Sequence, residues 1–166
     1  MNNLEIGDNK AVQEIAVKVL HEIKKFICEG VSEKEIADQC TLLLQKFGIT
    51  ECWYRKVPAF VLVGDRTVLS ISGRDYSPSD VRVKNSDLVT IDLSPKFGQF
   101  WGDCARSFLV ESGKVSEFSS NLELNDGVRA QQHLHQKMKQ AIRPEMELGE
   151  LFVLMNQEIR ILDIAT

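Results

Sequence analysis

The sequence predicts an α+β fold in which a helix pair, a set of mainly antiparallel strands and a second helix pair follow one another. Three observations support this prediction. Apolar residues recur at helical spacing near both ends of the chain. Between these regions, residues 88–111 alternate apolar and polar positions, as strands with one buried face do. The two helical regions also repeat each other at an offset of 115 residues.

The first helix pair is expected at residues 8–29 and 32–47. In the first helix, Val12, Ile15 and Val19 begin an apolar stripe, and Gly30 is expected to end the helix. Ser32, followed three positions later by Glu35, is typical of the capping box that starts a helix. The second helix is therefore expected to begin directly after residue 32.

The second helix pair is expected at about residues 126–142 and from about 148 to the end of the chain. When the first pair is moved forward by 115 residues, Val19 falls on Leu134, and Cys40 falls on Met155. The lengths of the helices and of the link between them also correspond. We therefore expect a duplicated helix pair.

Strands are expected at residues 51–56, 60–63 and 67–71, followed by a turn-rich loop at 73–80. Two longer strands follow at residues 88–94 and 99–111, with Pro95 and Gly98 on either side of a turn. Residues 114–125 are expected to be a polar connector. Arg106 falls on the apolar side of its strand, so we expect a bulge or a buried partner there, and thus a role in structural support.

Two aspartates on these longer strands are the main candidates for chemistry. If Phe97-Gly98 is a two-residue loop, Asp92 lies opposite Asp103, with Cβ atoms about 4.5–5.5 Å apart. One pKa should then rise unless a cation lies between them. Two divalent ions about 3.5–4 Å apart would fit this arrangement. The pattern equally fits a polar strand face with two solvated carboxylates, although Trp101 nearby favours a pocket.

Residues 91–108, IDLSPKFGQFWGDCARSF, resemble the metal-binding hairpin of the methionine aminopeptidase, Xaa-Pro dipeptidase and creatinase superfamily, which has the pita-bread fold. Asp92 and Asp103, eleven positions apart, match the first two of its five metal ligands. The resemblance implies one partial pita-bread domain over residues 1–166, with two pseudo-repeated helix pairs on a curved sheet. Residues 1–113 would be the first α+β half and 114–166 the helix pair of the second half, whose strand set is missing.

The resemblance also implies a dinuclear metallopeptidase, of the aminopeptidase or Xaa-Pro peptidase type, in which a metal-activated water attacks a peptide bond near a free N-terminus. Two divalent ions (Mn, Co, Zn or Fe) are expected for the complete domain. The remaining ligands, one His and two Glu, would lie in the missing strands. The histidines and two of the later glutamates fall in predicted helices: His21, His133, His135, Glu150 and Glu158. We therefore expect this chain, which resembles a truncated domain, to bind metal weakly and to be inactive alone.

Candidates for the substrate pocket are Trp101, Ser72 and Tyr76. Aminopeptidases of the family commonly have a His shortly before the hairpin. The corresponding stretch here, SISGRDYSPSD at residues 70–80, has none, and Ser72 or Arg74 takes its place. Both methionine and proline specificity are left open by this difference.

Two other functions fit parts of the sequence. One is a non-catalytic pita-bread module that binds peptides or proteins, and an exposed half-built sheet would favour homo-oligomers. The other is an unrelated two-carboxylate phosphoesterase. It would need further ligands, for which Asp65, Asp75 and Asp80 are the nearby candidates.

Composition narrows the class of protein. The chain has 166 residues, 43% of them apolar and 27% charged, with a net charge of −4 and no basic stripe, so nucleic acid is not an expected partner. No apolar run approaches the roughly 18 residues of a membrane span, and no signal-peptide pattern is present. The four cysteines (Cys28, Cys40, Cys52 and Cys104) lack paired metal-ligand spacing, which indicates reduced thiols and a cytoplasmic location.

Overall fold

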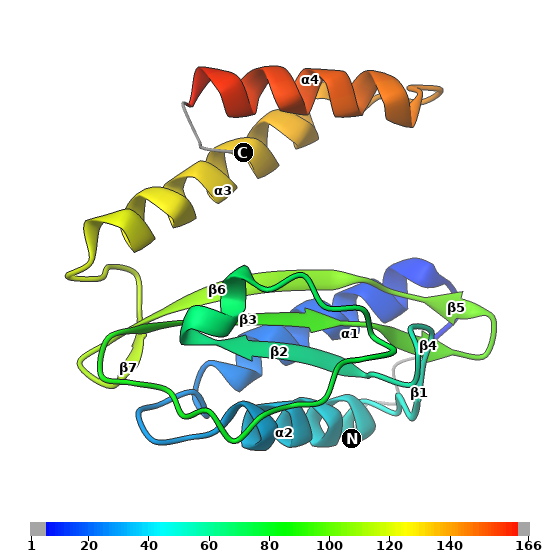
Figure 1. The fold of residues 1–166 in the computed structure, drawn as a ribbon. Helices are drawn as coiled ribbons and strands as arrows, with labels where there is room; N and C mark the ends of the chain where they lie inside the picture. The colour runs from blue at the N-terminus through cyan, green and yellow to red at the C-terminus, as the bar shows by residue number, and fades with distance from the viewer. Residues whose placement is uncertain (1–5, 163–166) are drawn as a thin grey trace. The chain divides into compact units, whose positions relative to one another are not determined.

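The computed structural model describes residues 6–162, which form two compact units, one up to Ser120 and one from Asn121 (Figure 1). The first unit contains, in order, α1 (Asn9–Ile23), α2 (Glu33–Lys46), β1 (Glu51–Cys52), β2 (Ala59–Val63), the 3₁₀ helix η1 (Gly64–Val68), β3 (Asp87–Leu93), β4 (Pro95–Phe97), β5 (Phe100–Trp101), β6 (Cys104–Glu111) and β7 (Lys114–Ser116). The second contains α3 (Leu122–Ala141) and α4 (Leu148–Ile161).

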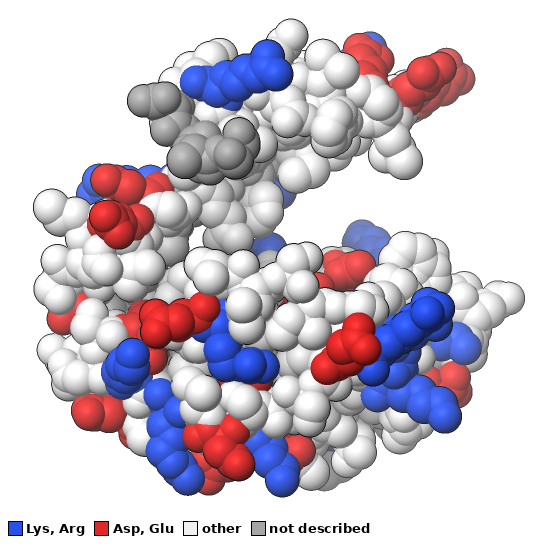
Figure 2. All heavy atoms as spheres, viewed as in Figure 1, with Lys and Arg blue, Asp and Glu red and all other residues white. Residues whose placement is uncertain are grey.

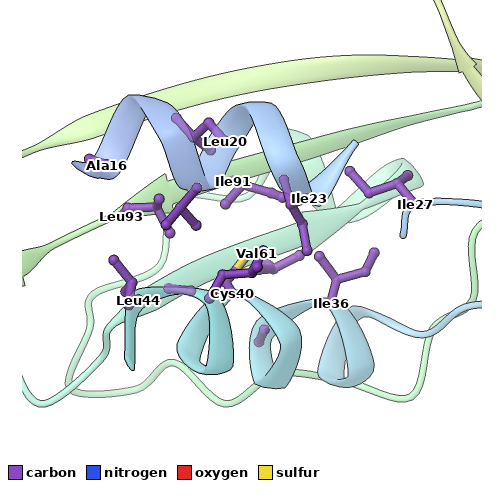
Figure 3. Packing of buried hydrophobic residues seen from close by; sticks show 14 of the residues in the cluster. Ala16, Leu20, Ile23, Ile27, Ile36, Cys40, Leu44, Val61, Ile91 and Leu93 are labelled. Carbon is purple, nitrogen blue, oxygen red and sulfur yellow. The ribbon is translucent and has the colours of Figure 1, made fainter. Parts of the chain in front are cut away.

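The main sheet is antiparallel, with strand order β2-β3-β6-β7, and a smaller sheet has the order β1-β4-β5. In β3 the predicted alternation is confirmed: Val89, Ile91 and Leu93 are fully buried, whereas Asp92 is exposed. Figure 3 shows apolar side chains of α1 and α2 directed toward this buried strand face. The helices and the sheet therefore share one hydrophobic core within the first unit.

The structure corrects the predicted end of the first helix. α1 stops at Ile23 rather than at residue 29. Cys28 instead forms a β-bridge with Lys114, and the Glu29 amide donates to the Gly113 carbonyl at 2.9 Å. These tertiary contacts draw the chain out of helical geometry although its apolar periodicity continues.

The start of α2 agrees with the prediction. The Ser32 hydroxyl accepts from the Glu35 amide, and the Glu35 carboxylate accepts from the Ser32 amide at 2.8 Å, so the capping box is complete. Glu33, the first helical residue, is fully buried. It is held by an ion pair with Arg66 at 2.9 Å.

Three predicted segments between the helices differ in the structure. Residues 67–71 do not form a strand, because the chain turns into η1, where the Thr67 hydroxyl donates to the Gly64 carbonyl at 2.8 Å. β1 ends at Cys52, and Arg55 and Lys56 take positive φ values of 47° and 62°, which extended strands exclude. Residues 114–116 of the expected connector pair with β6 as the strand β7.

The second unit is a helix pair. α3 begins at Leu122, earlier than predicted, because the Asn121 side chain caps the helix by accepting from the Glu123 amide at 2.9 Å. When α2 is moved forward by 115 residues, it covers 148–161, which are the bounds of α4. The predicted repeat of the second helix is therefore confirmed. No residue of α3 or α4 is fully buried.

Acidic and basic side chains are interspersed over the face of the molecule drawn in Figure 2. Over residues 6–162, no helix has the length and apolar character needed to cross a bilayer.

Candidate functional site

A pocket of about 220 Å³ in the first unit contains both candidate aspartates. We call it the two-carboxylate pocket. It is lined by Trp53, Tyr54, Val57, Phe60, Ile71, Asp92, Ser94 and Asp103. Asp92 comes from the exposed face of β3, and Asp103 from the residue before β6. The two carboxylates therefore open into one hollow, as the alternation along these segments predicts.

The pairing of the two strands differs from the prediction. The hairpin loop is Gly98-Gln99, because Gly98 takes φ +59° at the first turn position, so Asp92 faces Ala105 rather than Asp103. This moves the pairing by two residues, which keeps every side chain on its predicted face. Asp103 thereby becomes a diagonal neighbour of Asp92, a separation that side chains still span.

Asp92 lies in a desolvated and negatively charged environment. Loss of solvent around Asp92, together with the negative charge of Asp103, raises the pKa of Asp92 to about 6. No basic side chain lies among the pocket's lining residues to offset this charge.

Residues of α1 hold the Asp103 segment in place. The Gln13 amide group donates to the Asp103 carbonyl at 2.7 Å and accepts from the Asp103 amide at 2.8 Å. A Cβ atom on Gly102 would lie 3.1 Å from the Gln13 backbone nitrogen, so a larger residue there would push the segment away from α1. Sequence reasoning missed Gln13, because nothing local links it to a residue 90 positions away.

The three predicted substrate-pocket residues are not among the lining residues. Tyr76 stacks on Phe60 with ring centroids 3.9 Å apart, and its hydroxyl donates to the Val61 carbonyl and accepts from the Val61 amide. Trp101 packs on Trp53 at 5.6 Å. Ser72 is exposed, and its hydroxyl accepts from the Arg74 amide. Tyr76 and Trp101 thus pack against the lining residues Phe60 and Trp53 and do not line the pocket themselves.

Most of the aromatic lining was not predicted from the sequence. Trp53 is fixed by its indole N–H, which donates to the Gly102 carbonyl at 2.9 Å. Tyr54 accepts from the Gly73 amide through its hydroxyl. Both residues lie just after β1, in a stretch whose composition resembles an ordinary strand. A signal was available in the consecutive aromatic residues before Pro58.

Arg106 needs neither of the expected accommodations. The β3–β6 pairing runs through it without a bulge, and its side chain is exposed and donates to the Ala105 carbonyl at 2.6 Å. Cys104 beside it is buried, and burial raises the pKa of its thiol.

A family model for metallopeptidases of family M24 matches residues 8–162 of this chain. The chain belongs to metallopeptidase family M24. An uncharacterized peptidase of Schizosaccharomyces pombe is 26% identical over 113 residues, which cover 68% of this M24 chain and 23% of the relative. A Mycoplasma pneumoniae relative is 31% identical over 106 residues and is covered to 28% of its length. The chain thus spans about a quarter of the length of these curated relatives.

Solved structures share the fold of this M24 chain. An Xaa-Pro dipeptidase from Bacillus anthracis has a TM-score of 0.78 at 21% identity, with 95% of this chain and 40% of that one covered. A prolidase from Pyrococcus horikoshii has a TM-score of 0.78 at 23% identity, with 95% and 41% covered. At these identities the likeness shows the fold alone. The fold is the predicted pita-bread fold, present in part.

The described part of this M24 chain does not assemble a full metal centre. Within residues 6–162, no group of three or more His, Cys, Asp and Glu side chains is placed to hold a metal ion. His133 and Glu158 instead contact each other at 3.1 Å between α3 and α4, and Glu150 pairs with Arg143. His21 is exposed on α1. Asp65, Asp75 and Asp80 are exposed and do not line the pocket.

Proposed function

We propose that the two-carboxylate pocket is the substrate and metal site of an M24 peptidase that acts on peptides with a free N-terminus. Asp92 and Asp103 would be two of its metal ligands. The observation that carries the proposal is their convergence in one pocket, at the positions that resemble the family's first two ligands. The raised pKa of Asp92 supports it, because a divalent cation would offset both its causes, the lost solvent around Asp92 and the negative charge of Asp103.

The two carboxylates do not fit a dinuclear centre by themselves. Divalent transition metals bound by two carboxylates keep most coordination positions for water and are held weakly. We therefore propose that this chain alone binds metal weakly and does not hydrolyse peptides. A bound metal in a complete site would supply an activated water.

The test is metal binding and hydrolysis by the whole chain. Bound Mn, Co and Zn are measured after equilibrium dialysis, and cleavage is measured with Xaa-Pro peptides and Met-peptides, since the solved neighbours include an Xaa-Pro dipeptidase. We expect less than one metal ion per chain, a further loss in Asp92→Asn, and no turnover. Asp65→Asn is the matched control, because this exposed aspartate lies outside the pocket. Two bound ions per chain together with turnover would contradict the proposal that this chain alone is inactive.

A second candidate is a non-catalytic module that binds peptides. It is favoured by the pocket lining, in which aromatic and apolar side chains outnumber the carboxylates. Its distinguishing property is peptide binding that a chelator does not abolish. Such a module could work in the cytoplasm as a monomer or as a homo-oligomer.

A further inference from the structure

The second unit, drawn from yellow to red in Figure 1, has a long groove along its helix pair. The groove has a volume of about 1370 Å³, and its described lining residues all belong to α3, to α4 or to the turn that follows α4. Pockets that enclose small molecules usually measure about 300–1,000 Å³. The groove, which we call the α3–α4 groove, is therefore large enough for the surface of another protein chain.

The α3–α4 groove corresponds to the face by which the first helix pair covers the main sheet. When the first pair is moved forward by 115 residues, Ile23 falls on Met138 and Cys40 falls on Met155. Ile23 and Cys40 are fully buried in the hydrophobic core. Met138 and Met155 line the groove and are only half-buried. The second pair thus presents a core-like face that the described residues of its own unit leave partly exposed.

The groove side of α3 has opposite charges at its two ends. Four lining residues follow one another at intervals of four positions and so form one row along the helix: Glu123, Gly127, Gln131 and His135. Lys139 continues this row at the same interval, and both Glu123 and Lys139 are exposed. Among residues 6–162, neither of these two side chains forms an ion pair. The row therefore runs from a carboxylate to an ammonium group about 24 Å further along the helix.

This order of charges is complementary to itself in an antiparallel arrangement. When the α3 helices of two chains lie in opposite directions about a two-fold axis at Gln131, Glu123 of each chain meets Lys139 of the other. His135 then meets Gly127, where an added Cβ atom would have no neighbour within 4 Å outside its own stretch of helix, so there is room for the ring. A parallel arrangement would instead place like charges together, which is unfavourable.

We propose that the α3–α4 groove binds a second copy of this chain, with the two α3 helices antiparallel about Gln131. Burial of apolar groove residues such as Leu134 and Met138 supplies the favourable free energy. The two Glu123–Lys139 contacts select the direction and the register, because exposed ion pairs contribute little to affinity itself. The dimer needs neither a metal ion nor a substrate. The proposal therefore stands or falls separately from the peptidase function.

Charge reversal in the whole chain tests this arrangement. In Glu123→Lys both ends of the row are positive, and in Lys139→Glu both ends are negative. We expect each variant alone to dimerise at least about fivefold more weakly than the unaltered chain. An equal mixture of the two variants should form heterodimers, since every Lys then meets a Glu of the other variant, and should associate at least about tenfold more strongly than either variant alone. Sedimentation velocity over a range of concentrations gives the dissociation constants.

Two further variants separate the contact from general effects of charge and folding. The double variant Glu123→Lys/Lys139→Glu exchanges the two charges and should dimerise like the unaltered chain, even if one single variant loses helix as measured by circular dichroism. Arg160→Glu is the matched control, because Arg160 is exposed on α4 and does not line the groove. It should leave the dissociation constant unchanged.

Three results would overturn the proposal. The first is an unaltered chain that stays monomeric up to about 100 μM. The second is single variants that dimerise as strongly as the unaltered chain. The third is a mixture of the two variants that associates no more strongly than either variant alone.

Discussion

Asp92 is an acid that takes up a proton near neutral pH. Its pKa rises from the ordinary value of 3.8 to about 6, first because it has lost solvent in the pocket and second because of the Asp103 charge. The folded chain thus binds a proton on Asp92 more readily than the unfolded chain does. Stability contributed by this proton is present at acidic pH and is lost as pH rises from about 4 to about 6.

We expect Asp92→Asn to remove the decrease in the free energy of unfolding between about pH 4 and about pH 6. A shift of about two pKa units corresponds to roughly 3 kcal/mol. Because the Asp92 side chain is only partly desolvated and still reaches solvent, screening reduces this to about 1 kcal/mol. The free energy of unfolding at pH 7 should therefore rise by up to about 1 kcal/mol in the variant and change little at pH 4. Urea unfolding at both pH values measures it.

Asp103→Asn provides the internal control for this expectation. It removes the charge but leaves the desolvation, so the pKa of Asp92, followed by NMR, should fall below about 6 and stay above 3.8. An unchanged pKa would show that the two carboxylates do not interact.

At the scale of elements, the start of α2 joins three separate segments of the chain. The buried Glu33 carboxylate accepts from the Val63 amide at the end of β2, from Arg66 in η1 and from the Ser79 amide in the following loop. That loop carries Tyr76, which stacks on the pocket residue Phe60. The Glu33 carboxylate thus links the start of α2 to the end of β2, to η1 and to the loop that carries Tyr76.

We expect Glu33→Ala to cost about 3 kcal/mol of stability, because it leaves Arg66 and two backbone amides without their partner. Glu22→Ala, which breaks the exposed pair with Lys46, should cost less than about 1 kcal/mol. Urea unfolding of both variants makes the comparison. Equal losses would mean that burial of Glu33 adds nothing to the strength of its contacts.

The elements that sequence analysis predicted correctly depend on local patterns. The Ser32–Glu35 capping box and the alternation along β3 are both readable within a few residues. The errors have non-local causes. α1 ends early because Cys28 and Glu29 pair with residues about 85 positions away, and Asp92 faces Ala105 because Gly98 sets the turn. Residues 67–71 do not form the predicted strand, because the chain enters η1, in which Arg66 pairs with the distant Glu33.

At the scale of the whole molecule, the candidate site could be predicted only in part. The two aspartates were identified because they lie on one hairpin, with a recognisable spacing. Trp53 and Ile71 reach the same pocket from distant loops, and Gln13 of α1 holds the backbone of Asp103, so no sequence window contains them together. The family match covers residues 8–162, but the function of the pocket still depends on this convergence.

The two compact units differ in how far they bury their apolar residues. The hydrophobic core lies within the first unit, which also contains every lining residue of the two-carboxylate pocket. The helix pair of the second unit has no fully buried residue, and its large apolar side chains include Leu148, which is 84% exposed, and Phe152, which is 69% exposed. Isolated helices of this length are marginal in water without packing.

We therefore expect a chain that ends at Ser120 to unfold cooperatively and to keep the tryptophan emission of the full chain, since both tryptophans lie in the first unit. The full chain should self-associate more strongly, because Phe152 and its neighbours expose apolar surface. Sedimentation velocity over a range of concentrations compares the two. Phe152→Glu in the full chain should reduce association toward that of the shorter chain.

Two outcomes would contradict this expectation. If the shorter chain is unfolded, the second unit contributes to the stability of the first. If the shorter chain associates as strongly as the full chain, the contact surface lies in the first unit, as an exposed sheet edge would provide.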